Sequence, residues 1–173
     1  EASRRVDEAI DALHAVIRDI RNFIFGLRPV LLESGDLAQG LTHLATELRR
    51  SGGVAVAVEV DDDHGHLGRL PIETVAELLA IVREALSNVA RHAGATNCRV
   101  LLSSEPDRLR LEVHDDGRGF DPSRRGERGH HGLANMRSRG ESIGATFEVD
   151  SAHDRGTRII VVLRVQPGPT EEG

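Results

Sequence analysis

Apolar and polar residues alternate along this chain with periods that predict a helical start followed by a mixture of strands and helices. Seven apolar residues recur three or four positions apart over residues 1–27, which predicts an amphipathic helix that ends before Pro29. Asp36 is placed to cap a second helix of about 15 residues ending near Gly53, because Asp accepts hydrogen bonds from the first turn and Gly terminates helices.

Beyond Gly53 the apolar residues recur at every second position, as in a strand, and later at every third or fourth position, as in a helix. Valines at every second position predict a strand over residues 54–60, and a helix over 71–93 follows, which Gly94 ends. The remaining apolar runs predict four strands and one short helix: strands near 97–104, 108–115, 145–150 and 157–165, and a helix over 132–142.

Residues 116–131 are rich in Gly and Arg and nearly free of apolar side chains, so we expect a mobile loop there. The order of strands and helices predicts an α+β fold, a two-layer α/β sandwich in which helices cover one face of a mixed sheet. We expect three parts in the chain: a helical region over 1–29, the sandwich over 36–165, and a flexible tail over 166–173.

Composition narrows the possible functions. A net charge of −6 argues against a nucleic-acid-binding surface, which would be basic. The single cysteine, Cys98, excludes an internal disulfide and suits a reducing cytosol. No apolar run reaches the ~20 residues that a membrane span needs. We therefore expect a cytoplasmic chain with no membrane segment and no direct nucleic-acid partner. Because it opens inside a helical pattern, we interpret it as part of a longer protein.

One polar stripe runs along the helix predicted over 71–93. Glu84, Asn88, Arg91 and His92 lie at positions i, i+4, i+7 and i+8, so a regular helix places them on one face. A carboxylate and an amide one turn apart present oxygens to Mg²⁺ or its bound waters. Arg and His one turn further can meet phosphate charge. Taken alone, the stripe is better explained as a solvated polar face.

Two glycine-containing segments follow. Asp115 ends a predicted strand and precedes Gly117 and Gly119, where a buried carboxylate can accept a hydrogen bond from an exocyclic amine. Gly129 and Gly132 precede an apparent helix start, whose backbone amides can hold phosphate oxygens. Singly, these are an ordinary strand-to-turn and an ordinary loop-to-helix junction. Together with the polar stripe, their order and spacing indicate a pocket for a magnesium nucleotide.

The segments 84–88, 115–120 and 129–133 resemble the N, G1 and G2 boxes of the GHKL (Bergerat-fold) ATPases, over residues 36–165. The resemblance implies ATP and Mg²⁺ as cofactors. It implies that Asn88 ligates Mg²⁺ and that Glu84 orders the metal's waters or acts as a base. It implies further nucleotide contacts: Asp115 at adenine N6, Arg91 and His92 near the phosphates, Gly117 and Gly119 at the pocket floor, Gly129, His131, Gly132 and Leu133 in the lid, and Thr157, after Gly156, beside adenine.

A narrower resemblance rests on the chain's first helix. Its end, residues 20–29, is similar to the second dimerisation helix of the NarL/DesK-type sensor histidine kinases, and residues 126–136 look most like the actinobacterial hypoxia sensors DosS and DosT. This implies a homodimeric kinase that transfers the ATP γ-phosphoryl to a His outside this stretch and onward to an Asp of a response regulator. It also implies hypoxia sensing, with haem only in upstream sensor domains. His14 lacks the acidic neighbour of the family's phosphoacceptor.

Two other functions stay open at this point. The chain could be another GHKL protein, such as an anti-sigma-factor Ser kinase or a gyrase-like ATPase, although the helix ending at Pro29 argues against it. It could also be a regulatory nucleotide-binding module without catalysis, although intact Glu84, Asn88 and Asp115 argue against that. His64 and His66 lie in an acidic turn, which we expect to be a solvated loop rather than a metal site.

Overall fold

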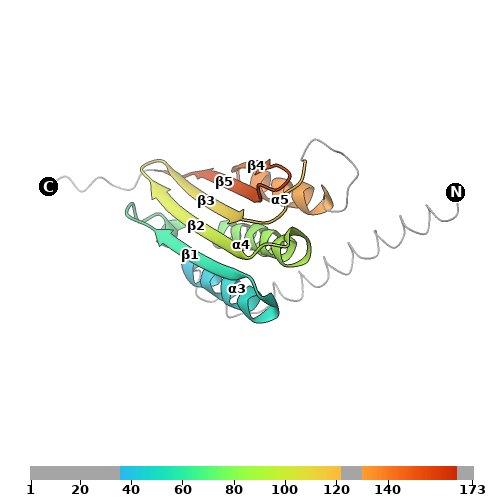
Figure 1. The fold of residues 1–173 in the computed structure, drawn as a ribbon. Coiled ribbons are helices and arrows are strands. Elements are labelled where there is room, and N and C mark those ends of the chain that lie inside the picture. The colour runs from blue at the N-terminus through green and yellow to red at the C-terminus, as the bar shows by residue number, and fades with distance from the viewer. Residues whose placement is uncertain (1–35, 122–129, 167–173) are drawn as a thin grey trace, which may run out of the picture. The chain divides into compact units, whose positions relative to one another are not determined.

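The described part of the chain folds into one sheet with helices on one of its faces. The computed structural model describes residues 36–121 and 130–166 (Figure 1). Its helices are α3 (Leu37–Gly52), α4 (Ile72–Asn88) and α5 (His130–Ser142). Its strands are β1 (Ala55–Asp61), β2 (Asn97–Glu105), β3 (Arg108–Asp115), β4 (Thr146–Ser151) and β5 (Thr157–Arg164).

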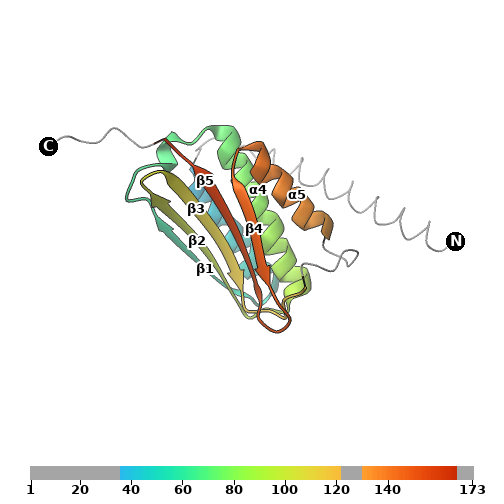
Figure 2. The same ribbon diagram turned by 90° about the horizontal axis from the view of Figure 1, so that it is seen from above.

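The strands form a mixed sheet in the order β1-β2-β3-β5-β4, in which only β1 and β2 run parallel. In Figure 2 the three helices lie on the same side of this sheet. The two-layer α+β sandwich predicted from the sequence is therefore confirmed. Among the described residues, no helix is both long enough and apolar enough to cross a membrane. The predicted helix over 1–27 and the predicted tail lie outside the described residues, except for Gln166.

The predicted helix ends are explained by local chemistry. The carboxylate of Asp36 accepts a hydrogen bond from Gln39 N at 3.1 Å, and Gly53 ends α3 with φ 69°. A π turn (Val89–Ala93) continues α4, and Gly94 ends it with φ 62°. α5 begins at His130 rather than at residue 132, two residues earlier than the sequence predicted.

The core lies between the sheet and the helices. Alternate residues of the strands point toward the helices, among them Val100, Leu111 and Val161, which are at most 2% exposed. They pack with the apolar faces of α3, α4 and α5. The opposite face of the sheet is polar: Glu112 is 7% exposed there and pairs with Arg110 and Arg158. This division places the apolar side of every central strand under the helices.

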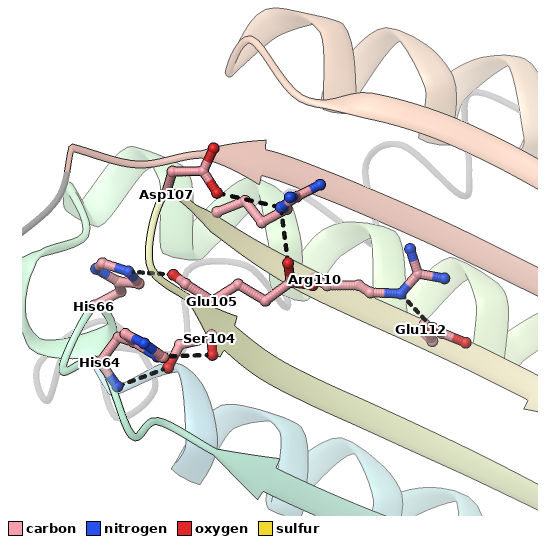
Figure 3. A network of polar contacts seen from close by, with 8 residues as sticks. His64, His66, Ser104, Glu105, Asp107, Arg110 and Glu112 are labelled. Atoms are coloured by element: carbon pink, nitrogen blue, oxygen red, sulfur yellow. Dashed lines mark hydrogen bonds and ion pairs between the residues drawn. The ribbon is translucent and has the colours of Figure 1, made fainter.

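The loop after β1 is docked onto the end of β2 (Figure 3). A ring nitrogen of His64 lies 3.1 Å from Ser104 O, and Nε2 of His66 lies 2.7 Å from Glu105 O. His66 is only 3% exposed, so the expectation of a solvated loop is wrong for this residue. The backbone carbonyls at the end of β2 account for its burial, because each gives an imidazole N–H an acceptor. The described residues contain no cluster of three or more potential metal ligands.

Candidate functional site

A pocket of about 400 Å³ lies at the end of the sheet where β3 ends and β5 begins. The end of α4, the end of β3 and the β4–β5 turn meet at this end of the molecule (Figure 2). Half of the lining residues are apolar, and they come from α4, its π turn, β3, the loop after β3, α5 and β5. Polar groups enter at six positions: Asn88, His92, Asp115, Arg118, His153 and Thr157. An apolar cleft with a few fixed polar groups is typical of a small-molecule site.

The helical wall carries part of the predicted polar stripe. Asn88 and His92 line the pocket, as the spacing predicted. Arg91 and Glu84 are not among the residues that line the pocket, so their expected roles beside the phosphates and the metal stay predictions. A π turn begins directly after Asn88, and its wider winding gives the residues that follow other positions than a regular α-helix would. π turns occur frequently at functional sites.

The start of α5 lies against Glu84 and Asn88. A Cβ placed on Gly132 would lie 2.5 Å from Glu84 Oε1 and 3.6 Å from Asn88 Nδ2. Gly132 is therefore the point at which the first turn of α5 passes the two residues expected to serve a metal. Leu133, the next residue, lines the pocket. Gly129 and the side chain of His131 lie outside the described residues.

Asp115 is the buried acid of the pocket. It is 5% exposed, and its Oδ1 accepts a hydrogen bond from Gly117 N at 2.8 Å. Burial raises the pKa of the Asp115 carboxyl, while hydrogen bonds from the backbone of Gly117 and Thr157 act in the opposite direction. Gly117 has no room for a side chain, since a Cβ there would lie 2.5 Å from Ala93 O. The Asp-x-Gly spacing thus fixes one carboxylate oxygen and lets α4 approach closely.

The β4–β5 turn is packed directly onto the Asp115 segment. A Cβ on Gly119 would lie 2.0 Å from Ala152 O, and one on Gly156 would lie 1.9 Å from Asp115 O. The Ser151 hydroxyl joins the two segments, because it accepts from Phe120 N at 3.0 Å and lies 2.9 Å from Gly156 O. Only residues without a side chain fit at these two glycine positions.

Sequence reasoning did not single out three residues that line the pocket: Arg118, Phe120 and His153. Arg118 and Phe120 lie inside the 115–120 segment, so their neighbourhood to Asp115 and Gly119 was a usable signal. His153 lies in a turn between strands, and nothing in its local sequence indicates that the turn folds over the pocket. Its position follows from the hydrogen bond of Asp154 N to Arg118 O at 2.7 Å, which ties the turn to the loop after β3.

Comparison with known proteins agrees with this geometry. The family model "Histidine kinase-, DNA gyrase B-, and HSP90-like ATPase" matches residues 73–167, which contain α4, the pocket and strands β2 to β5. The chain belongs to this family. The family name is that of ATPases, so the match supports ATP binding by this domain.

Individual relatives point to sensor proteins. The chain is 34% identical over 160 residues to the sensor protein VraS of Staphylococcus aureus, covering 90% of this chain and 44% of that protein. The VraS of Staphylococcus epidermidis is 33% identical over the same length. The chain thus spans less than half the length of these curated relatives.

Solved structures show the same fold. The histidine kinase domain of the blue-light activated histidine kinase from Erythrobacter litoralis EL346 superposes with a TM-score of 0.57 at 26% identity, covering 74% of this chain and 60% of that chain. The mycobacterial sensor histidine kinase MprB superposes with a TM-score of 0.58 at 21% identity, covering 77% and 97%, and supports the fold alone.

Proposed function

We propose that this chain is the catalytic, ATP-binding domain of a sensor histidine kinase of the NarL/DesK type. In this function it holds ATP so that the γ-phosphoryl group reaches an imidazole nitrogen of a His outside the chain. The P–N bond forms as the bond to the ADP oxygen breaks. The domain contributes positioning and charge stabilisation rather than covalent chemistry. The single observation that carries the proposal is the buried Asp115 carboxylate, fixed by Gly117 N at the edge of an apolar pocket.

Asp115 is the residue that would select the base. An ionised carboxylate accepts hydrogen bonds and cannot donate them, so it suits the exocyclic amine of adenine. Guanine presents an oxygen at the equivalent position, which would face the carboxylate without a hydrogen. An unsatisfied buried polar pair of this kind costs about 1–3 kcal/mol, or roughly a 5- to 150-fold difference in affinity.

Magnesium suits the residues between α4 and α5. Asn88 lines the pocket, and the carboxylate of Glu84 lies one turn away beside Gly132, so the oxygen ligands that Mg²⁺ prefers are gathered at one place. When bound, Mg²⁺ would neutralise phosphate charge. We assign Asn88 as its direct ligand and Glu84 as the residue that orders its waters or acts as a base. Gly132 and Leu133 would cover the phosphates, and His92 would lie near them.

Base selectivity tests the proposal. Titration calorimetry of the chain with ATP and GTP, each with Mg²⁺, should give tighter binding of ATP, and Asp115→Ala should reduce the difference. Asn88→Ala should weaken the nucleotide with Mg²⁺ far more than the nucleotide without it. Equal affinities for ATP and GTP in the unmodified chain would refute the role of Asp115, and an undiminished magnesium effect in Asn88→Ala would assign the metal elsewhere.

The wider setting is part of the same proposal. We assign a response regulator as the phosphoryl acceptor downstream, since the relatives are sensor proteins. We assign a homodimer through the helical region in the longer protein, since residues 20–29 resemble a dimerisation helix. The finer resemblance to DosS and DosT, with hypoxia sensing and haem in upstream domains, rests on residues 126–136 alone. A cytoplasmic location stays a prediction from composition. Among the alternatives, a gyrase-like ATPase or a Ser kinase is disfavoured because the relatives that match 90% of this chain are sensor proteins.

Phosphotransfer distinguishes a kinase from a non-catalytic nucleotide-binding module. Incubated with labelled ATP, this chain should not label itself, whereas it should label a protein that contains the preceding helix with its His-acidic pair. Binding of ATP without any such transfer would favour the regulatory module. Acid-labile label on this chain alone, lost in His14→Gln, would show that His14 is the acceptor.

A further inference from the structure

Asp116 holds the two walls of the pocket together from outside. Its Oδ1 accepts hydrogen bonds from the backbone N–H groups of Thr96 at 2.8 Å and Asn97 at 2.9 Å. Its Oδ2 accepts from Thr96 Oγ1 at 2.8 Å and Asn97 Nδ2 at 2.7 Å. We call these three residues the Asp116 clamp. All four bonds end on one carboxylate, which is exposed and does not line the pocket.

The clamp connects segments that carry pocket residues on both sides. Asp116 directly follows Asp115, the buried acid. Thr96 and Asn97 follow the π turn, which carries His92 and Ala93 into the pocket. Asp116 N also donates to Asn97 O at 3.2 Å. The clamp therefore joins the end of the helical wall to the end of the β3 wall.

A second contact lies directly beside the clamp. Arg118 N donates to Ala93 O at 2.9 Å, and the same carbonyl leaves no space for a side chain on Gly117. Both contacts depend on the connection between the π turn and β2 lying against the segment after β3. If that connection moves away, Ala93 O and Gly117 separate, and the residues around Asp115 are no longer held against the helical wall.

We propose that Asp116 is a positioning residue of the nucleotide site, which sets the separation between the helical wall and Asp115 and thereby the selectivity for adenine. This inference rests on the proposed function. The Asp116 side chain does not line the pocket, so its effect passes through Thr96 and Asn97. Displacement of reacting or recognising groups by about 1 Å can cost on the order of a hundredfold.

The charge of the clamp supports the same role. Hydrogen bonds from Asn97, through its backbone and its side chain, and from Thr96 hold the pKa of Asp116 far below its usual range. The carboxylate is therefore ionised throughout the pH range in which a kinase works, and its four hydrogen bonds are charge-assisted.

The test compares Asp116→Ala with Asp116→Asn. Asn keeps an oxygen for the two backbone donors, and its amide can donate to Thr96 Oγ1, but it loses the charge and the bond from Asn97 Nδ2. Thr96→Val removes one of the four bonds and keeps its backbone N–H. Glu148→Ala on the exposed side of β4 serves as the matched control for loss of a surface carboxylate. Affinities for Mg-ATP and Mg-GTP are measured by calorimetry at a temperature well below each variant's unfolding midpoint.

We expect Asp116→Ala to bind Mg-ATP on the order of ten- to a hundredfold more weakly and to lose most of the preference for ATP over GTP. Asp116→Asn and Thr96→Val each lose one of the four bonds, so both should lie between Asp116→Ala and the unmodified chain, and Glu148→Ala should match the unmodified chain. If Asp116→Ala does not fold, Thr96→Val and Asp116→Asn test the proposal in its place. Unchanged affinity and unchanged selectivity in Thr96→Val would then overturn it.

Three other outcomes are decisive. A lower unfolding midpoint in Asp116→Ala with unchanged affinity and selectivity would show a purely structural role and overturn the inference. Equal losses in Asp116→Ala and Asp116→Asn would overturn the hydrogen-bonding basis of the clamp. An unmodified chain that binds neither nucleotide would instead refute the proposed function, and the two failures are thus distinguishable.

Discussion

Replacement of Gly156 by Ala tests how tightly the β4–β5 turn is packed on the pocket. Gly156 has φ 71°, a left-handed conformation that costs an L-residue about 1–2 kcal/mol. A Cβ there would also lie 1.9 Å from Asp115 O and 3.0 Å from Asp115 C, both of them backbone atoms. The collision cannot be relieved by a side-chain rotation, so either the turn or the end of β3 must move.

Gly144 offers a matched control. It has nearly the same φ, 73°, but no atom lies within 4 Å of the position that its Cβ would take. Gly144→Ala should therefore cost only the conformational term of about 1–2 kcal/mol. Gly156→Ala should add the overpacking cost of about 1–3 kcal/mol, for a total of about 2–5 kcal/mol. At roughly 3–4 °C per kcal/mol for a domain of this size, the midpoint should fall by roughly 3–8 °C in Gly144→Ala and by roughly 6–20 °C in Gly156→Ala.

Thermal unfolding by circular dichroism gives the two midpoints, and calorimetry with Mg-ATP gives the effect on the site. Because the collision involves the carbonyl of Asp115, Gly156→Ala should also weaken Mg-ATP, whereas Gly144→Ala should bind normally. Equal midpoints for the two variants would refute the reasoning, since the conformational term would then account for the whole loss. Lower stability of Gly156→Ala with unchanged affinity would show that the turn, and not the end of β3, absorbs the displacement.

Three further predictions follow from buried ionisable groups. Burial raises the folded-state pKa of Asp115, so the stability that this group contributes at low pH is lost as pH rises through that pKa. The unfolding midpoint of Asp115→Asn relative to the unmodified chain should therefore increase as pH rises from acid through that pKa, and a pH-independent difference would contradict this. Burial alone would raise the pKa of Glu112, but hydrogen bonds from Arg110 and Arg158 lower it below its ordinary value. Glu112→Gln should therefore be less stable than the unmodified chain at neutral pH, and this difference in stability should shrink as pH falls through that pKa. A loss of stability that persists in acid would show that packing is its cause. Burial, with the nearby carboxylates, raises the pKa of the Cys98 thiol to about 12, so a thiol reagent at neutral pH should label it only on unfolding, and stoichiometric labelling of the folded chain would contradict this.

Much of the fold could be predicted because its helix ends and strand faces depend on nearby residues. Asp36 caps α3 through a donor three residues away, and Gly53 and Gly94 end helices through their own backbone angles. Alternating valines placed β1 to within one residue at each end. Each of these signals acts over a few positions, which is the range over which a sequence pattern can be interpreted without knowledge of the fold.

The errors occurred where a distant partner decides the outcome. His66 is buried because Glu105 O, 39 residues away, accepts its ring N–H. The π turn after Asn88 was not predicted either, because no propensity distinguishes a π turn from the α-helix that it extends. The Asp116 clamp likewise joins residues 19 and 20 positions apart. A second Asp beside Asp115 is an ordinary turn residue until the fold brings Thr96 and Asn97 to it.

The glycines show why the three sequence segments had to be considered together. Gly53, Gly94 and Gly144 have positive φ and open space around the position of a Cβ, so they serve only the backbone turn in which they lie. Gly119 and Gly156 have the same kind of backbone angle, but a Cβ on either would collide with backbone of the other segment at the pocket. Conformation alone therefore does not separate a site glycine from a turn glycine. What separates them is contact with another chain segment, and the sequence expresses that contact only through the joint spacing of an acid, its glycines and a late Gly-Thr.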